Sequence, residues 1–216
     1  MRCWGASGVD AFPLAMLGSF CIVLDINRSA VRIGKTFSKK VGLKSKIDFI
    51  IGSATALPFR DVSIDLVTCF SVLDHLLTKG DVRMSVHEFS RVIKDFGYVA
   101  ITVPNKLFLI GTISMRLKRL LETDALFEER FTPREMREIM VQSGLTPIGF
   151  DSKYPTKIGV TFMKYNLPKI VSKFPKRLIL SVFAVAESLF QRIERITWLR
   201  LFGARFGYLC LKNPEL

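Results

Sequence analysis

The chain has 216 residues, the length of one domain that can bury a substantial core. Its hydrophobic fraction of 49% excludes an intrinsically disordered protein, and its four Cys residues lack the spacing of a zinc or redox motif. No apolar stretch reaches the roughly 20 residues of a membrane-spanning helix, and the start does not resemble a signal peptide. We therefore expect a cytoplasmic domain with reduced cysteines and no metal site, whose net charge of +13 favours an anionic partner.

The first half of the chain alternates short apolar runs with amphipathic segments. The runs are rich in β-branched residues and almost unbroken, which is typical of parallel strands buried on both faces. They are residues 20–27, 47–51, 64–70 and 98–105. Residues 29–41 predict a helix that ends at Gly42, and residues 82–93 predict a second helix. This order predicts an α/β sheet.

The second half continues with helices and two further strands. Residues 107–121 have apolar positions at helical spacing, which predicts a lid helix. Thr132 has the place of an N-cap and Glu135 completes a capping box, so a helix should begin there and stop at Gly144. Strands are expected at residues 145–150 and 205–212.

Residues 155–203, between these last two strands, form a basic segment of amphipathic character. From Asp151 to the C-terminus the chain has twelve Lys or Arg and four Asp or Glu, a net charge of +8. A basic amphipathic helix within residues 167–201 can lie on an anionic membrane surface, and it can equally pack on the lid or on a second subunit. A solvated basic face is the plain alternative. Nucleic acid is the less favoured partner, because stacking platforms and RNA-binding modules are not recognised.

Four short motifs between these elements follow one another in a fixed order. They are Gly52-Ser53-Ala54, Leu57-Pro58-Phe59, Val72-Leu73-Asp74-His75-Leu76 and Arg91-Val92-Ile93-Lys94. Their order and spacing resemble the class I S-adenosylmethionine-dependent methyltransferases, in particular the type that acts on small molecules and lipids. The resemblance implies a Rossmann-like, doubly wound, mostly parallel sheet with an antiparallel last strand, to which this chain adds a C-terminal helical segment.

The same resemblance divides a single domain into parts and implies S-adenosyl-L-methionine as the cofactor. Residues 1–105 would be the cofactor-binding half, and residues 106–154 the lid helix and substrate-side half. Residues 155–203 would be a basic amphipathic helical insertion, and residues 204–216 the last strand. Acceptor identity and oligomeric state are not indicated.

The resemblance places the adenosine part of the cofactor at the ends of the strands that begin at residues 20 and 47. Asp25 should accept hydrogen bonds from both ribose hydroxyls, because a carboxylate has two acceptor oxygens, with Ile26 beside it. A simple turn Asp at a strand end is the alternative. The acidic residue that binds the adenine amino group in the family falls at Ser53, which brings no charge and should weaken binding. Ala54 should supply backbone contacts.

The loop after the strand at residues 64–70 is expected to border the reacting groups. Phe70 and Ser71 would line the cofactor, and Asp74 and His75 would lie on the next turn near the substrate entrance. A neutral imidazole at His75 can take a proton from a hydroxyl or an amine, which makes it the candidate catalytic residue. The alternative is that it caps or packs a helix.

Two local features are expected in the helix at residues 82–93 and in the turn after it. Glu88 and Arg91 are expected on an exposed face of the helix. In the following turn, Gly97 is expected to take a positive φ angle.

The N-terminal residues determine how complete the cofactor site is. Gly5 and Gly8 resemble an altered glycine-rich loop that approaches the methionine carboxylate. The family's first strand stands before this loop in the middle of the sheet, and here it is expected to be missing. Either the true start lies upstream, or the chain is a shortened relative. The predicted function is methyl transfer to a small-molecule or lipid-like acceptor, and the alternative is a non-catalytic binding or scaffold protein.

Overall fold

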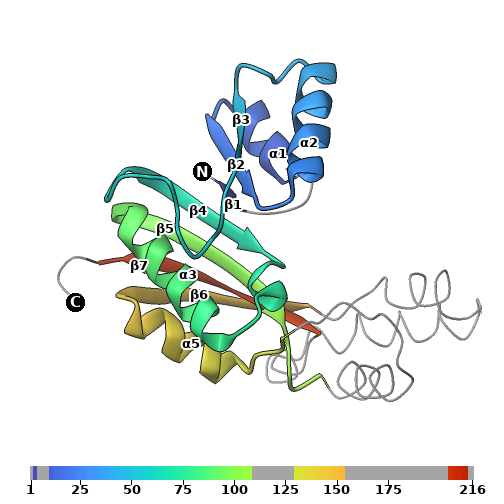
Figure 1. Ribbon diagram of the computed structural model, residues 1–216. Coiled ribbons are helices and arrows are strands. Elements are labelled where there is room, and N and C mark those ends of the chain that lie inside the picture. Colours follow the sequence, from blue (N-terminus) through green and yellow to red (C-terminus); the bar gives the residue numbers. More distant parts are fainter. Residues whose placement is uncertain (1, 4–9, 109–128, 154–203, 214–216) are drawn as a thin grey trace, which may run out of the picture.

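The computed structural model describes residues 2–3, 10–108, 129–153 and 204–213, and its centre is a seven-stranded sheet (Figure 1). The strands are β1 (Arg2–Cys3), β2 (Cys21–Asp25), β3 (Ile47–Ile51), β4 (Ile64–Phe70), β5 (Ile93–Pro104), β6 (Leu145–Lys153) and β7 (Arg205–Lys212). The helices in these ranges are α1 (Ala11–Met16), α2 (Arg28–Lys40), α3 (Lys79–Val92), α5 (Pro133–Gln142) and the short 3-10 helix η1 (Leu73–His75).

The strand order is β3-β2-β1-β4-β5-β7-β6, with parallel pairing from β3 through to β5. β7 pairs antiparallel with both β5 and β6. Parallel neighbours need crossover connections, and α1, α2 and α3 lie in those connections. The predicted Rossmann-like, mostly parallel sheet with an antiparallel last strand is therefore confirmed. In such a sheet, ligands lie outside the carboxyl ends of the strands where the order reverses, here between β1 and β4.

A short first strand occupies the centre of the sheet, which corrects the prediction that this strand is missing. Arg2 pairs with Val23, and Cys3 pairs with both Leu24 and Cys69, in each case in parallel. The prediction was wrong because it required an apolar run of several residues. A strand of two residues has no periodicity to detect.

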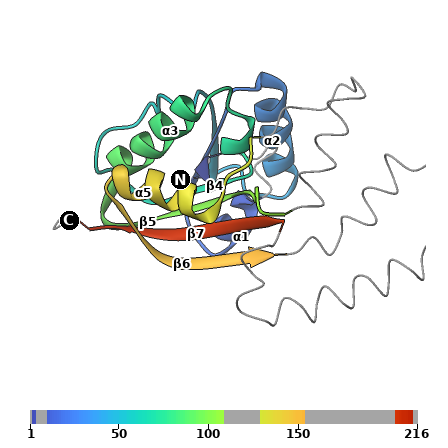
Figure 2. The same ribbon diagram turned by 90° about the horizontal axis from the view of Figure 1, so that it is seen from below.

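Alternation along β2 divides the apolar core between the two faces of the sheet. Val23 belongs to a cluster of eight buried residues with α1 and α2. Its neighbour Leu24 points the other way and belongs to a cluster of twenty-two buried residues with α3 and α5. Figure 2 shows α3 and α5 on the same side of β5, β6 and β7. That side therefore has the larger share of hydrophobic stabilisation, at about 1.5–3 kcal/mol for each large side chain that is fully buried.

The helix ends follow the capping signals of the sequence. Thr132 Oγ1 accepts a hydrogen bond from the Glu135 N–H at 3.1 Å, and the Glu135 carboxylate accepts one from the Thr132 N–H at 2.8 Å. This pair is the predicted capping box of α5. Gly144 then takes a φ of 78° where α5 ends, and Gly42 takes 74° after α2. Glycine suits both stops because it enters this left-handed region without a Cβ clash.

The turn that enters the paired part of β5 differs from its prediction. Phe96 takes the positive φ, at 59°, whereas Gly97 was expected to do so. Gly97 is buried, and a Cβ there would lie 2.8 Å from Ile93 Cγ1 and 3.1 Å from the Asp65 carbonyl oxygen. Glycine is therefore needed at this position for the close approach of two chain segments.

The cysteines behave as small hydrophobic side chains. Cys21, Cys69 and Cys210 are buried, and burial raises the pKa of the Cys210 thiol to about 12. Among the helices that the structure describes, none is long and apolar enough to cross a membrane. The lid helix expected at residues 107–121, apart from its first two residues, and the insertion expected at residues 155–203 lie outside the described residues.

Candidate cofactor and acceptor site

Asp25 ends β2 at the carboxyl edge of the sheet, next to β1 and the point of strand reversal. It is only 8% exposed, and its Oδ1 accepts a hydrogen bond from the Asn27 N–H at 2.8 Å. Asn27 in turn caps α2 by accepting from the N–H groups of Ser29 and Ala30. In the described part of the chain, Asp25 Oδ2 has no hydrogen-bond partner. The strand end and helix start therefore fix a carboxylate that keeps one acceptor oxygen.

The surroundings of Asp25 fit an adenosine group. Ile26 is 65% exposed and offers an apolar surface beside the carboxylate. Gly52, after β3, donates its N–H to the Asp25 carbonyl oxygen at 3.1 Å, and a Cβ at Gly52 would approach Leu24 Cδ1 to 3.0 Å. An acceptor for hydroxyl groups, an apolar surface and a backbone without a side chain are what a ribose and its base require.

Ser53 and Ala54 lie in a tight loop after β3 that uses its own polar groups. The Ser53 and Thr55 hydroxyls are 2.8 Å apart, and the Thr55 N–H donates to Ser53 Oγ at 3.3 Å. Ala54 is fully buried, so only its backbone can face a ligand. The Ser53 oxygen therefore has less acceptor capacity for an adenine amino group than a carboxylate has at this position.

The loop between β3 and β4 is clamped to α3 by two side chains that were expected on an exposed face. Glu88 accepts the Leu57 N–H at 2.7 Å, and Arg91 donates to the carbonyl oxygens of Leu57 at 3.0 Å and Phe59 at 2.9 Å. Arg91 also pairs with Glu88 and Asp61. Hydrogen bonding by Arg91 lowers the pKa of Glu88, and Glu88 raises the pKa of Arg91. Helix periodicity did not predict this contact because a distant loop supplies the partners.

Phe70 ends β4 and Ser71 follows it, on the other side of β1 from Asp25. Ser71 has a φ of 58°, a left-handed conformation that costs a non-glycine residue about 1 kcal/mol or more. Its N–H donates to the Thr102 carbonyl oxygen at 3.1 Å, which holds the bend against β5. The strained bend therefore lies at the strand end where this type of sheet binds ligands.

Asp74 and His75, predicted together near the substrate entrance, have different surroundings. Asp74 is fully buried, and its Oδ2 lies 2.7 Å from Arg205 Nη2 in an ion pair. His75 is exposed, and within the described ranges its imidazole has no hydrogen bond or ion pair. His75 thus presents an imidazole at the loop surface, whereas Asp74 anchors the loop.

Asp74 connects segments that meet at the carboxyl edge. Its carbonyl oxygen accepts the Glu129 N–H at 2.7 Å, and its carboxylate binds Arg205 at the start of β7. Asn105, fully buried after β5, donates its N–H to the Ala204 carbonyl oxygen at 2.9 Å. Sequence reasoning missed the ion pair because its members are 131 positions apart. A signal existed, since an acidic residue inside an apolar run needs a partner when it is buried.

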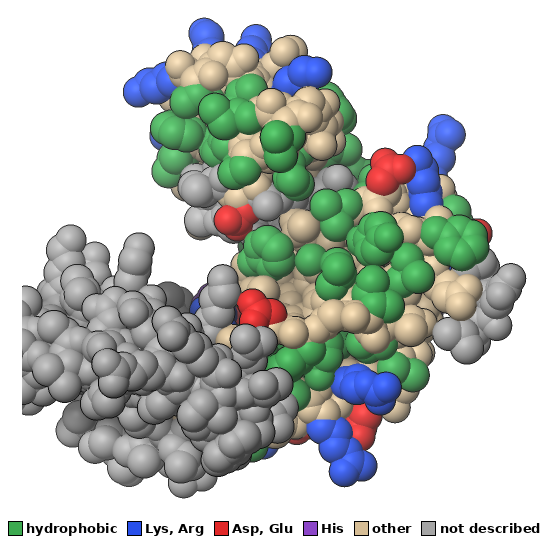
Figure 3. Space-filling view, turned by 180° about the vertical axis from the view of Figure 1, so that it is seen from behind, with side chains coloured by type: hydrophobic (Ala, Val, Ile, Leu, Met, Phe, Trp, Pro, Cys, Tyr) green, Lys and Arg blue, Asp and Glu red, His purple; other side chains and the backbone are tan. Residues whose placement is uncertain are grey.

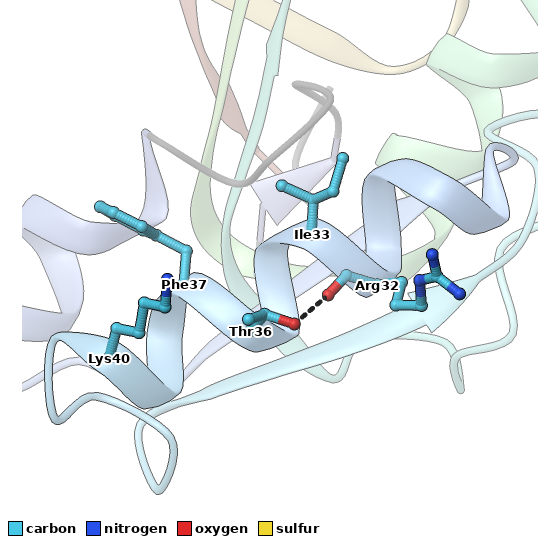
Figure 4. A pocket seen from close by; sticks show the side chains of 5 residues that line it. All are labelled: Arg32, Ile33, Thr36, Phe37 and Lys40. Atoms are coloured by element: carbon cyan, nitrogen blue, oxygen red, sulfur yellow. Dashed lines mark hydrogen bonds between the residues drawn. The ribbon is translucent and has the colours of Figure 1, made fainter.

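Gly5 and Gly8 lie outside the described residues. No group of three or more His, Cys, Asp or Glu side chains that could hold a metal ion is found in the ranges given above. A hollow of about 340 Å³ on α2 includes none of the predicted cofactor residues (Figure 4). It is lined by Arg32, Ile33, Thr36, Phe37 and Lys40.

Comparison with known sequences finds similarity in the first half of the chain. Residues 4–101 match the methyltransferase domain family. YcgJ of Bacillus subtilis (strain 168), an uncharacterized methyltransferase, is 35% identical over 77 residues, which are 36% of this chain and 29% of YcgJ. UbiE of Bartonella tribocorum, a ubiquinone/menaquinone biosynthesis C-methyltransferase, is 31% identical over 96 residues, which are 43% of this chain and 36% of UbiE. The chain thus spans about a third of the length of these relatives.

Comparison with solved structures extends the likeness in fold to the rest of the chain. The crystal structure of an S-adenosylmethionine-dependent methyltransferase from Methanosarcina mazei matches with a TM-score of 0.68 and 15% identity. The match covers 98% of this chain and 91% of that protein. The match of residues 4–101 to the methyltransferase domain family and the likeness in fold to a solved methyltransferase agree with each other, and the chain is similar to both.

Proposed function

We propose that the protein transfers the methyl group of S-adenosyl-L-methionine to a small-molecule or lipid-like acceptor. The observation that carries this proposal is the Asp25 carboxylate, buried at the end of β2 with one acceptor oxygen left for a ligand. The cofactor of the family supplies a methyl group that its sulfonium charge already activates. The protein's task is therefore to bind and align two reactants.

The residues that bind the adenosine part lie at the ends of β2 and β3. Asp25 accepts hydrogen bonds from the ribose hydroxyls, and the exposed Ile26 side chain packs on the base. Ser53 contacts the adenine edge with its hydroxyl, and Ala54 contacts it through the backbone. These contacts exclude water from one face of the ligand and fix its direction along the strand ends.

The residues near the transferred group lie after β4 and before α1. Phe70 and Ser71 border the transfer site, and Gly5 and Gly8 let the backbone approach the methionine carboxylate. His75, at the exposed end of η1, takes up a proton when the acceptor atom carries one. Replacing His75 by Gln tests this role, which predicts a fall in kcat of about 100-fold or more. An unchanged kcat would mean that this loop aligns the reactants and that His75 does not take up a proton.

The acceptor class rests on the relatives. The name of UbiE gives C-methylation in quinone biosynthesis, which supports an acceptor with an apolar body. The basic stretch at residues 167–201 contacts an anionic membrane surface, where an acceptor of this kind is concentrated. Replacing Arg192, Arg195 and Arg200 by Gln should weaken pelleting of the full chain with phosphatidylserine vesicles. Unchanged pelleting would remove this contact from the proposal.

The experiment that tests the proposed function follows label from the tritiated methyl group of S-adenosylmethionine. The full chain is incubated with a membrane lipid extract or with an aqueous metabolite extract, and label is counted in organic and aqueous products. We expect organic-soluble label that falls at least about tenfold in Asp25→Ala and stays unchanged in Asp48→Ala, the exposed carboxylate of β3. Cofactor binding without labelled product in either extract would favour the non-catalytic alternative.

A further inference from the structure

The outward side of α2 carries cations that the proposed methyl transfer does not use. Residues 28–46 contain seven Lys or Arg and no Asp or Glu, so this stretch contributes +7 to the net charge of +13. The cations are Arg28, Arg32, Lys35, Lys39, Lys40, Lys44 and Lys46. Each described ion pair lies elsewhere, from residue 61 onwards. The positive charge of α2 is therefore uncompensated over the part of the chain that the structure describes.

Exposed apolar side chains lie beside these cations. α2 buries Ala30, Val31, Gly34 and Ser38, which leaves the opposite side of the helix facing outward. Ile33 is 60% exposed and Phe37 is 45% exposed on that side. Successive helical residues are about 100° apart, so Ile33 and Phe37 share one edge of the outward side, one turn apart. Figure 4 shows the Ile33 and Arg32 side chains pointing to different sides of the helix axis.

The hollow on α2 lies between the basic and the apolar edge. Arg32 and Lys40 supply positive charge to it, and Ile33 and Phe37 supply apolar surface. Phe37 is held by an edge-to-face contact with Phe12 of α1, with ring centroids 5.0 Å apart. A fixed apolar surface beside two cations matches the phosphate group and upper acyl chain of a phospholipid.

The turn after α1 extends the apolar surface beyond α2. Met16, Leu17 and Phe20 are 75%, 83% and 56% exposed, and they lie between α1 and the start of β2. Figure 3 shows hydrophobic side chains gathered on the upper lobe of the molecule, with Lys and Arg side chains along its rim. Exposed aliphatic side chains gain nothing from a phosphate backbone of nucleic acid, whereas a bilayer interface removes them from water.

We propose that the α2 face, made by Arg32, Ile33, Thr36, Phe37, Lys39 and Lys40, docks on an anionic lipid membrane. Ile33, together with Met16 and Leu17, enters the headgroup region, and Lys39 and Lys40 contact lipid phosphates. Docking on such a membrane would give a partner both to the cations of α2 and to the exposed apolar residues beside them. The α2 face is made of other residues than the basic stretch at 167–201, and the proposal does not depend on the proposed methyl transfer.

The test measures partition of the full chain onto vesicles of phosphatidylserine and phosphatidylcholine by sedimentation. Each Lys or Arg near an anionic surface contributes about fivefold, so Lys39→Glu with Lys40→Glu, which also adds two repelled carboxylates, should weaken partition by at least about 30-fold. Ile33→Ser should weaken it too, and its effect should persist in high salt, where the charge contribution is screened. The matched control is Arg83→Glu with Arg137→Glu, which removes two exposed cations from α3 and α5 and should change partition far less.

Four results would overturn the proposal. The first is equal partition onto pure phosphatidylcholine vesicles, and the second is an equal loss in the control variant. The third is a loss confined to Arg192→Gln with Arg195→Gln, which would assign all membrane contact to residues 167–201. The fourth is an unchanged vesicle partition of the Lys39 and Lys40 variant together with weaker binding of single-stranded RNA, which would make the α2 face a nucleic-acid surface. Circular dichroism melting of every variant separates these results from loss of folding.

Discussion

The lobe that carries Asp25 (residues 10–51, the cofactor-side lobe) and the lobe from residue 52 onwards (the substrate-side lobe) meet at β1 (Figure 1). The cofactor-side lobe has a separate core of eight buried residues, whereas the other core has twenty-two. The described ion pairs all lie in the substrate-side lobe. The larger core and the ion pairs stabilise the substrate-side lobe, whereas the cofactor-side lobe has exposed apolar side chains and, among its described residues, no ion pair.

The largest expected effect comes from truncating one buried ring in each lobe. Phe89→Ala should lower the free energy of unfolding by about 4 kcal/mol, because Phe89 is fully buried in the larger core. Phe12→Ala should open residues 10–51 and leave amide protection in β5 and β7 unchanged, since its cluster does not include them. Hydrogen exchange measures both. Loss of protection throughout the sheet in Phe12→Ala would mean that the two lobes unfold as one unit.

The ion pair of the substrate-side lobe should give the next largest effect. Asp74→Ala removes a buried carboxylate from Arg205, which is itself partly exposed, so we expect a loss of about 2–3 kcal/mol in urea unfolding. Arg205→Ala should cost about as much, and the double variant should cost less than the sum of the two. Arg205→Lys should recover part of the stability. Additive single effects would show that the contact is not energetically coupled.

The clamp on the loop between β3 and β4 should make stability depend on pH. Arg91 lowers the pKa of Glu88 in the folded state, so the contribution of Glu88 is complete above its unfolded pKa of about 4.5. It is lost as the pH falls through the lowered folded value. Replacing Glu88 by Gln should cost about 1.5 kcal/mol at neutral pH and almost nothing near pH 3. A difference between wild type and variant that does not change with pH contradicts the clamp.

A cap in the substrate-side lobe should give the smallest effect. Thr132→Ala removes the acceptor for the Glu135 N–H and should cost about 1 kcal/mol in thermal or urea unfolding. Thr36→Ala on exposed α2 is the matched control, because its hydroxyl donates to the Arg32 carbonyl oxygen and caps no helix. The control should change stability by less than about 0.5 kcal/mol. Equal costs in both variants would argue against the capping box.

Local signals were sufficient to predict most of the fold. Apolar runs gave β3 and β4 with the observed bounds, and the Thr132 capping box and Gly144 gave both ends of α5. These features depend on a few neighbouring residues, so a pattern in sequence is enough to find them. The short β1 was missed because its pairing partners, and not its own residues, make it a strand.

Features that depend on distant residues were not predictable. The partner of Asp74 is 131 positions away, and the partners of Glu88 and Arg91 are on another loop. Counting charged residues along the sequence drew attention to the excess of Lys and Arg near the C-terminus and not to that of α2. The basic residues of an amphipathic helix look like an ordinary solvated face until its ion pairs are known. At the site, Asp25 and its strand end were predicted, whereas the hydrogen bond between the Ser53 and Thr55 hydroxyls was not.

The most direct test of the account is calorimetric titration of S-adenosylmethionine into the full chain, into Asp25→Ala and into the exposed control Asp48→Ala. A carboxylate that accepts ribose hydroxyls contributes about 1.5–3 kcal/mol, so Asp25→Ala should bind about tenfold to a hundredfold more weakly. Asp48→Ala should bind as the wild type does. Equal affinity of Asp25→Ala and wild type, or no binding by the wild type, would contradict a cofactor site at the end of β2.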